Sequence, residues 1–212
     1  MKTIILTAIF SYIIGSIPFG YLAGLTKGVD IRTLGSKNIG ATNVFRNLGK
    51  KLGIITFILD MLKGVTAVVV IPCAVKYLFC EEPNLNEAYV VITGAVSVLI
   101  GHSFPFTLGF KGGKGVATGL GLAIGIAPIS ALTGFVLWAI IFRASGYVSL
   151  ASIIAAIYVA IGTWFIDYAS ADNCIIQITI TLLATLIVIK HKSNIQRLIN
   201  GCENRFSFKK DK

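Results

Sequence analysis

Charged residues are scarce in this chain. Only 13% of its 212 residues are Asp, Glu, Lys or Arg, whereas soluble domains contain about 25%. Five stretches carry no such residue, at 3–26, 88–110, 115–142, 144–166 and 173–189. A helix needs about 20 apolar residues to cross a hydrocarbon core about 30 Å thick. The lack of charge therefore excludes an ordinary soluble globule and a disordered chain, and it predicts a polytopic helical membrane protein.

Cysteine and acidic side chains are also few. The four cysteines form no C-x-x-C pair and no Cys/His spacing typical of a metal site. No carboxylate cluster and no G-x-S-x-G elbow is present, and Thr107 and Gln196 stand where an H-x-x-x-x-D acyltransferase box would need aspartate. These absences exclude a disulfide scaffold and argue against a serine-hydrolase triad. We expect no metal and no cofactor.

The excess of basic residues gives a net charge of +10. In a membrane chain, basic loops set the topology and contact anionic lipid, so we expect no nucleic-acid partner. Segments 27–51 and 190–212 are basic, whereas 81–87 and 167–172 are acidic. The positive-inside rule then predicts an external N-terminus and a cytoplasmic C-terminus.

The number of spans follows from this alternation of basic and acidic loops. The basic C-terminal tail lies inside only if 116–142 forms two short segments that meet near the Gly125–Pro128 stretch, where glycine and proline interrupt a helix. We therefore predict an all-α transmembrane bundle of about seven spans, two of them short. No internal repeat divides the chain, so residues 1–212 are expected to form a single membrane-embedded domain.

Polar chemistry gathers in three segments that this topology places on the inner face. The first, 35–46, combines glycine, hydroxyl, amide and guanidinium groups, and includes Ser36, Asn38, Thr42, Asn43 and Arg46. Glycines let backbone N–H groups converge on an anion, and arginine offers a bidentate fork for phosphate. An ordinary polar turn with a helix cap fits this segment equally well.

The second segment joins His102 to a glycine loop, 109–115, that opens a helix. The N–H groups of Gly112 and Gly113, the positive end of the helix dipole and Lys114 are together suited to hold one phosphate. The alternatives are a bare hinge for the loop and a packing role for His102.

The third segment, 191–203, places His191 and Asn194 three residues apart, on one side of a continuing helix. That side faces either a headgroup or the site, and a basic interfacial end is the alternative. Arg143 is a further candidate for a second phosphate or a helix cap. Asp60 and Lys63 are expected to form a structural ion pair on the second span.

Together the three segments resemble the PlsY family, the acyl-phosphate-dependent glycerol-3-phosphate acyltransferases of bacterial membranes. The resemblance rests on G-S-K-N-I-G-A-T-N-V-F-R, on G-H followed by F-K-G-G-K-G-V-A-T, and on H-K-S-N-I-Q-R-L-I-N-G-C-E, with D-M-L-K-G at 60–64. Lys37 stands where the family usually has glycine, and Cys202 where threonine is common. The likeness covers nearly the whole chain, in order.

The resemblance implies a reaction, in which glycerol 3-phosphate and acyl phosphate give lysophosphatidate and inorganic phosphate in phospholipid biosynthesis. It implies a seven-helix protein of the bacterial inner membrane with a cytoplasmic site, and the enzyme that makes acyl phosphate as a partner. It assigns catalytic roles to Ser36, Arg46, Lys114 and His191, substrate binding to Asn38, Thr42, Asn43, His102, Gly112, Gly113, Arg143 and Asn194, and a structural role to Asp60, Lys63 and Glu203.

Two other classes of protein are alternatives to an acyltransferase. An anion transporter would need polar groups on both halves of the bilayer, whereas the outer loops here are short and acidic. A lipid phosphotransferase would need clustered acidic metal ligands, which the inner segments lack. Two bound phosphates repel each other strongly in a low dielectric, so the reaction implied by the family requires several fixed cations, and these the inner segments supply.

Overall fold

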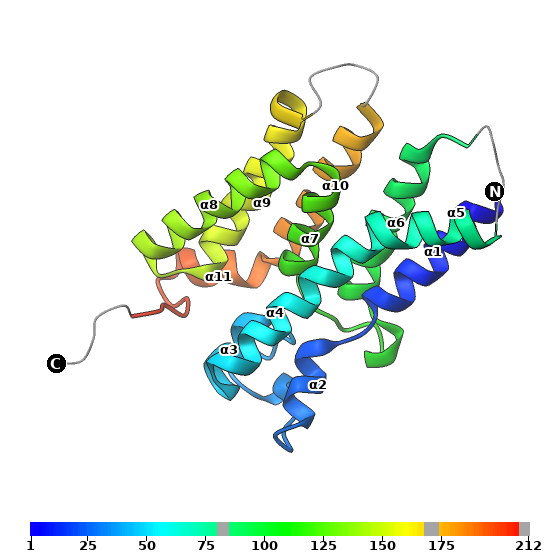
Figure 1. Cartoon of the computed structure of the whole chain (residues 1–212). Helices are drawn as coiled ribbons and strands as arrows, with labels where there is room; N and C mark the ends of the chain where they lie inside the picture. The colour runs from blue at the N-terminus through cyan, green and yellow to red at the C-terminus, as the bar shows by residue number, and fades with distance from the viewer. Residues whose placement is uncertain (80–84, 168–173, 208–212) are drawn as a thin grey trace. The chain divides into compact units, whose positions relative to one another are not determined.

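The structure is a computed structural model that describes residues 1–79, 85–167 and 174–207, and within these residues it contains helices and no strand (Figure 1). In lipid every backbone polar group must be satisfied inside the chain, so long apolar runs form helices. The chain divides into two compact units, Met1–Ile126 and Ala127–Lys212. Most of the two acidic loops used to predict the topology lies outside the described residues.

The first unit has seven α-helices in its described part, with a π-helix, η2 (Thr66–Val70), continuing α4 into α5. The α-helices are α1 (Lys2–Gly15), α2 (Phe19–Leu25), α3 (Ala41–Leu48), α4 (Lys50–Val65), α5 (Ile71–Phe79), α6 (Glu87–Ser103) and α7 (Val116–Ile126). Short 3₁₀ turns lie at η1 (Ile31–Thr33) and η3 (Phe106–Leu108).

Glycines set the close packing of this first unit. A Cβ built on Gly121 would overlap the Met61 carbonyl, and one on Gly64 would overlap the Thr118 carbonyl, so α4 and α7 touch backbone to backbone. Small residues allow this approach between membrane helices, which have no hydrophobic drive to associate in lipid.

The second unit consists of four α-helices in its described part. They are α8 (Pro128–Ser145), α9 (Val148–Gly162), α10 (Cys174–Lys190) and α11 (Lys192–Ile199), with the π-helix η4 (Thr163–Asp167) ending α9. Helix α9 packs on α8 and on α10, and α11 also contacts α9. The side chain of Asp167 accepts hydrogen bonds from the N–H groups of Ile129 and Ser130, which satisfies the start of α8.

The number of candidate spans is slightly below the predicted seven. Within the described residues, five helical stretches are long and apolar enough to cross a membrane, and a sixth is formed if α10 and α11, bent by 55°, are taken together. The predicted interruption is also present, because α7 ends at Ile126 and α8 begins at Pro128. Helix α7 is short, at 11 residues, whereas α8 has 18 and is longer than expected. The structure thus supports an all-helical polytopic bundle.

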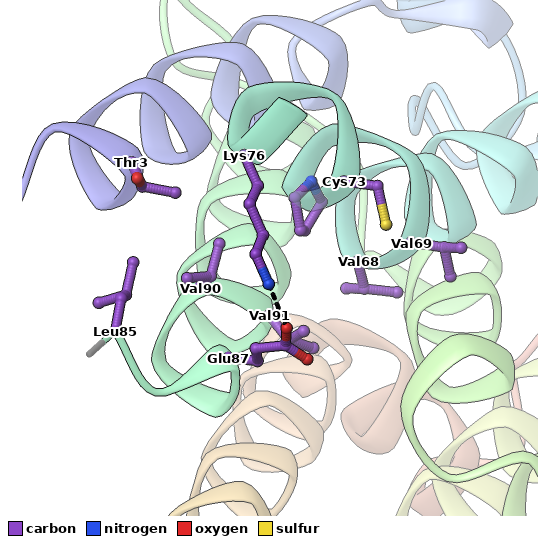
Figure 2. A pocket seen from close by; sticks show the side chains of 10 residues that line it. Thr3, Val68, Val69, Cys73, Lys76, Leu85, Glu87, Val90 and Val91 are labelled. Carbon is purple, nitrogen blue, oxygen red and sulfur yellow. Dashed lines mark hydrogen bonds and ion pairs between the residues drawn. The ribbon is translucent and has the colours of Figure 1, made fainter. Parts of the chain in front are cut away.

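A cavity of about 230 Å³ opens in the first unit between α1, α5 and α6 (Figure 2). Its walls include valine side chains from η2 and α6, and beside it the Lys76 ammonium group donates to the Glu87 carboxylate at 2.6 Å. Thr3 also lines it, so the N-terminus lies at this end of the unit. On α6, His102 lies 15 residues after Glu87, which corresponds to about 22 Å along the helix at 1.5 Å per residue.

Candidate active site

The first polar segment forms a tight turn before α3. Gly35 and Lys37 both have positive φ angles, of 51° and 57°, and the Lys37 N–H donates to the Leu34 carbonyl at 2.9 Å. The Ser36 side chain between them is exposed. The substitution of lysine for the usual glycine therefore falls at a left-handed backbone position, where a side chain with a Cβ is strained.

Asn43 holds this turn together. Its side-chain amide is 4% exposed and donates to the carbonyls of Ile31, Leu34 and Asn38, while its Oδ1 accepts from the Ser36 N–H at 3.0 Å. Asn47 donates a further bond to the same Oδ1. The whole hydrogen-bonding capacity of the Asn43 amide is therefore used by the protein. This differs from the expected contact with substrate and favours a supporting role.

Neighbouring residues build the start of α3. The Asn38 side chain accepts from the Gly40 N–H at 2.8 Å, closing a local turn. Thr42 and Arg46 lie four residues apart on α3 and are both half-buried, so they share one helix face. The first N–H groups of a helix have no intrahelical acceptor and carry the positive end of its dipole. One face of α3 thus offers a hydroxyl, a guanidinium group and a positive helix end to an anion.

The glycines of the second segment serve close packing. The Gly112 N–H donates to the Ser103 carbonyl at 3.2 Å and the Gly113 N–H to the His102 carbonyl at 3.0 Å. A Cβ on either glycine would overlap His102, at its carbonyl oxygen or its ring. Both N–H groups are thus engaged within the protein, and the role of these two glycines in binding substrate stays a prediction. Lys114 follows directly, and Gly115, with φ of 82°, leads into α7.

Beneath this loop is a buried ionic cluster. The Lys63 ammonium group lies 2.7 Å from Asp60 Oδ1, as predicted for this pair, and also donates to the carbonyls of Gly15 and Ile17 at 3.1 and 3.2 Å. His102 Nδ1 lies 3.6 Å from the same Asp60 oxygen, and the His102 side chain is 4% exposed. His102 therefore faces Asp60 and the glycine loop, a geometry that favours the packing alternative over the expected contact with substrate.

The first two segments lie at the same end of the first unit. Leu108, in the loop after His102, packs against the small core formed by Ile31, Ile39 and Val44. The Thr107 hydroxyl donates to the Ser16 carbonyl at 2.9 Å, at the break between α1 and α2. Ser36, Arg46 and Lys114 thus come from segments that share one end of the unit.

The third segment begins at the bend between α10 and α11. His191 is 3% exposed, and its Nδ1 lies 2.8 Å from the Ile187 carbonyl oxygen. A carbonyl can only accept, so Nδ1 carries the proton and the lone pair of the neutral ring is at Nε2. The His191 carbonyl caps the next helix by accepting from the Asn194 and Ile195 N–H groups. This arrangement suits a ring that accepts a proton or a hydrogen bond through Nε2.

Glu203 organises the rest of this segment. Its carboxylate accepts from Ser149 Oγ at 2.9 Å, from Asn194 Nδ2 at 2.7 Å and from Arg197 Nε at 2.6 Å. Burial alone would raise the pKa of Glu203, but the hydrogen bonds from Asn194, Ser149 and Arg197 outweigh it and hold the pKa below its usual value. This geometry is what a structural role for Glu203 requires.

Sequence reasoning did not anticipate the docking of residues 205–206. The Phe206 N–H donates to the Gly146 carbonyl at 2.9 Å, and Arg205 Nε donates to the Ser145 carbonyl at 3.0 Å. The Phe206 ring meets Phe142 edge-on, with centroids 5.4 Å apart. The exposed Arg143 lies in the last turn of α8, next to this junction. The left-handed Gly146 was the only local signal that the junction is tight.

Asn47 was also missed. It donates to both the carbonyl and the side-chain oxygen of Asn43, and its position four residues after Asn43 could have revealed it. Among the residues that the structure describes, no group of three or more His, Cys, Asp or Glu side chains could hold a metal ion.

Comparison with known proteins gives a single answer. The profile of the family described as glycerol-3-phosphate acyltransferase matches residues 5–201. The chain is 43% identical to the glycerol-3-phosphate acyltransferase of Aquifex aeolicus over 206 residues, covering 97% of this chain and all of that protein. It is 41% identical to the one of Acholeplasma laidlawii, covering 98% and 94% of the two chains.

Solved structures agree with these relatives. The chain resembles crystal structures of PlsY, an integral membrane glycerol 3-phosphate acyltransferase. For the glycerol 3-phosphate form the TM-score is 0.84 at 39% identity, over 96% of both chains. For the lysophosphatidic acid form it is 0.81 at 38% identity, over 96% and 95%. The family match over residues 5–201 includes the first two polar segments and most of the third, and the chain belongs to the glycerol-3-phosphate acyltransferase family as an integral membrane protein of the PlsY type.

Proposed function

We propose that this protein transfers an acyl group from acyl phosphate to glycerol 3-phosphate, giving lysophosphatidate and inorganic phosphate. The observation that carries the proposal is the likeness, over 96% of the chain, to a protein solved in its glycerol 3-phosphate and lysophosphatidic acid forms. Those two molecules are an acceptor and a product of this reaction. Acyl phosphate is already activated, so no covalent enzyme intermediate is needed.

Fixed cations hold the two phosphates in this proposal. As the family resemblance implies, Ser36, Arg46 and Lys114 bind glycerol 3-phosphate, and His191 and Asn194 assist in binding it. The Thr42 hydroxyl and the start of α3 bind the acyl phosphate, and Arg143 serves the second phosphate. Asn38, Asn43, Gly112 and Gly113 support these groups by shaping the two loops. Positioning and neutralisation of charge then supply most of the rate.

A phosphate of the substrate acts as the general base. The acid side chains in the described part of the chain all have partners within it: Asp30 pairs with Arg32, Asp60 with Lys63, Glu87 with Lys76 and Glu203 with Arg197, and Asp167 caps α8. None of them is therefore poised to take the proton of the glycerol hydroxyl. A phosphate monoester with a second pKa near 6 is suited to this role at neutral pH. His191, with its lone pair at Nε2, is the alternative base.

The site faces the cytoplasm of a bacterial inner membrane, with the N-terminus outside. The proposal rests on the basic character of 27–51 and 190–212 and on the internal order of the first unit, where Thr3 and Glu87 share the end opposite His102. Single cysteines introduced in a background without native cysteine, at Lys2 and at Lys50, should be labelled from opposite sides. Labelling of both from one side would contradict this orientation.

The reaction is tested with purified protein in lipid micelles. Radiolabelled glycerol 3-phosphate is offered with acyl phosphate, acyl-CoA or acyl carrier protein as the donor. Of the three donors, we expect only acyl phosphate to give labelled lysophosphatidate, with inorganic phosphate released in equal amount. The matched control is Lys114→Met, which removes the proposed phosphate ligand and should lose the product. Product from acyl-CoA alone would contradict the donor proposed here. The enzyme that makes acyl phosphate is then the expected partner upstream.

A further inference from the structure

The buried ionic cluster of α4 and α6 has no direct part in the chemistry proposed above. We propose that Asp60, Lys63 and His102 form a positioning network that fixes the Gly112–Gly113 loop and thereby the place of the Lys114 ammonium group. This inference rests on the proposed function, because it takes Lys114 to be a ligand of a substrate phosphate.

The network places an ion pair, Asp60 and Lys63, and a neighbouring histidine deep within a membrane protein. The side chains of Asp60 and Lys63 are each 3% exposed, and that of His102 is 4% exposed. Replacing a buried ion pair by apolar residues is often neutral or even stabilising, so stability alone does not explain such a pair. Ionisable residues inside membrane spans are rare and mark functional sites by default. A role in fixing the geometry of the glycine loop explains why these charged side chains are buried despite the free-energy cost.

Lys63 connects the network to the start of the chain. Besides Asp60, its ammonium group donates to the carbonyls of Gly15 and Ile17, where α1 ends. These two carbonyls flank Ser16, whose own carbonyl accepts the Thr107 hydroxyl from the loop after α6. One lysine thus ties together α4, the end of α1 and, through Ser16, the loop that leads to Lys114.

His102 connects the network to the glycine loop. Its Nδ1 faces Asp60, while its carbonyl accepts the Gly113 N–H at 3.0 Å. The opposite edge of its ring lies so close to Gly113 that a Cβ there would overlap Nε2 and lie 2.8 Å from Cε1. A rotation of the ring toward Gly113 would therefore displace this glycine, and Lys114 is the next residue in the chain.

The other side of Lys114 is held by the same turn of α4. Gly64, directly after Lys63, is in backbone contact with Thr118 in the first turn of α7. Lys114 is thus fixed on one side by His102, through Gly113, and on the other by α7 packed on α4. Displacing a substrate ligand by about 1 Å can cost about 100-fold in rate.

A double-mutant cycle between His102 and Gly113 tests this coupling. His102→Asn keeps an amide N–H near the position of Nδ1, facing Asp60, and removes the ring edge that touches Gly113. Gly113→Ala adds the Cβ that overlaps this edge. We expect Gly113→Ala to lower kcat/KM about 100-fold and His102→Asn about 10-fold, whereas the double variant is no worse than Gly113→Ala and recovers part of its loss. Independent effects, which would multiply to about 1000-fold, would overturn the proposal.

A second pair of variants tests the charged part of the network. Asp60→Asn leaves Lys63 buried without a counter-charge, so the double variant Asp60→Asn/Lys63→Met is made beside it to preserve folding. Both are expected to lower kcat/KM per folded molecule by about 10- to 100-fold, mainly through the KM for glycerol 3-phosphate. The matched control is Thr56→Val, one turn earlier on the same buried face of α4, which should stay within about twofold of wild type.

The outcomes separate positioning from simple stability and from direct binding. If either Asp60 variant only lowers the melting temperature and the yield of folded protein, with kcat/KM per folded molecule unchanged, the network is structural and the proposal is wrong. If His102→Asn raises only the KM, with no coupling to Gly113, His102 is a substrate ligand and the proposal is also wrong. Failure of the proposed function itself is distinct, since the wild-type protein would then form no lysophosphatidate.

Discussion

Removal of the Glu203 carboxylate should destabilise the second unit strongly. The Glu203 side chain is 4% exposed and accepts three hydrogen bonds, of which that from Arg197 Nε is the shortest, at 2.6 Å. Breaking a buried charge pair costs about 3–5 kcal/mol, but the Arg197 side chain is 33% exposed and regains water. We therefore expect the lower end, about 3 kcal/mol, for Glu203→Ala. For a chain of this size that lowers Tm by about 6–12 °C.

Thermal unfolding in detergent micelles, with acyl-transfer rates measured on the folded fraction, is the assay. Glu87→Ala is the matched control, because Glu87 likewise pairs with a basic side chain, Lys76, at 2.6 Å but is 77% exposed. An exposed pair contributes at most about 1 kcal/mol, so the control should lose less than about 4 °C. Equal losses for the two variants would refute the importance that we assign to the burial of Glu203.

The same variant has a defined pH dependence. The pKa of Glu203 is lowered in the folded protein, so the folded state is stabilised more by the ionised carboxylate than by the protonated one. Its stabilising effect is fully present above the unfolded pKa of about 4.3 and is lost as the pH falls through the lower folded pKa. The Tm difference between wild type and Glu203→Ala should therefore be constant from neutral pH down to about pH 5 and shrink as the pH falls below about 4.3. A difference that grows on acidification would contradict the assigned contacts.

Three further predictions concern the loops and the site. Lys37→Gly should raise stability by about 1 kcal/mol, because it relieves a left-handed φ of 57°, whereas the control Lys37→Ala keeps the Cβ and should show no such gain in thermal unfolding. Arg46→Ala and Lys114→Ala should each nearly abolish acyl transfer while circular dichroism stays that of folded helices, and near-normal turnover at saturating substrate would refute the role in phosphate binding. His191→Ala should reduce kcat only partially and leave a pH–rate profile governed by a pKa near 6, whereas loss of that inflection would make His191 the base.

Most of the fold could be predicted from the distribution of charge. Long runs without charged residues predicted the spans, and the alternation of basic and acidic loops required a break near Gly125–Pro128, which the structure contains. The length of α8 was underestimated, because the boundary was drawn at the last apolar residue before Arg143, whereas the helix continues to Ser145. Charge marks where a span leaves lipid, but a helix continues past that point as long as its backbone stays satisfied.

The hydrogen-bond partners of the candidate site residues could not be predicted from the sequence. Gly112 and Gly113 were expected to expose N–H groups, yet both donate to carbonyls of the α6 end. Glycine permits both an anion cradle and a close backbone approach. Which of the two forms depends on the contact of these glycines with the end of α6, about ten residues earlier in the chain. Asn43 was likewise expected at the substrate, but its acceptors in η1 and the following turn are visible only once the loop is folded.

The two histidines show how far local sequence determines chemistry. The partner of His191 Nδ1 is the Ile187 carbonyl, four residues earlier, where the His191 N–H turns instead to Val188, and helical spacing permits such a bond. The tautomer that leaves a lone pair at Nε2 was therefore within reach of sequence reasoning. The partner of His102 is Asp60, 42 residues earlier and on another helix, so its orientation depends on how α4 and α6 pack. Since both rings are almost fully buried, burial does not distinguish them, and the identity of the Nδ1 partner does. A carbonyl there prepares the opposite nitrogen to accept a proton, whereas a carboxylate ties the ring into the ionic network beneath Gly113.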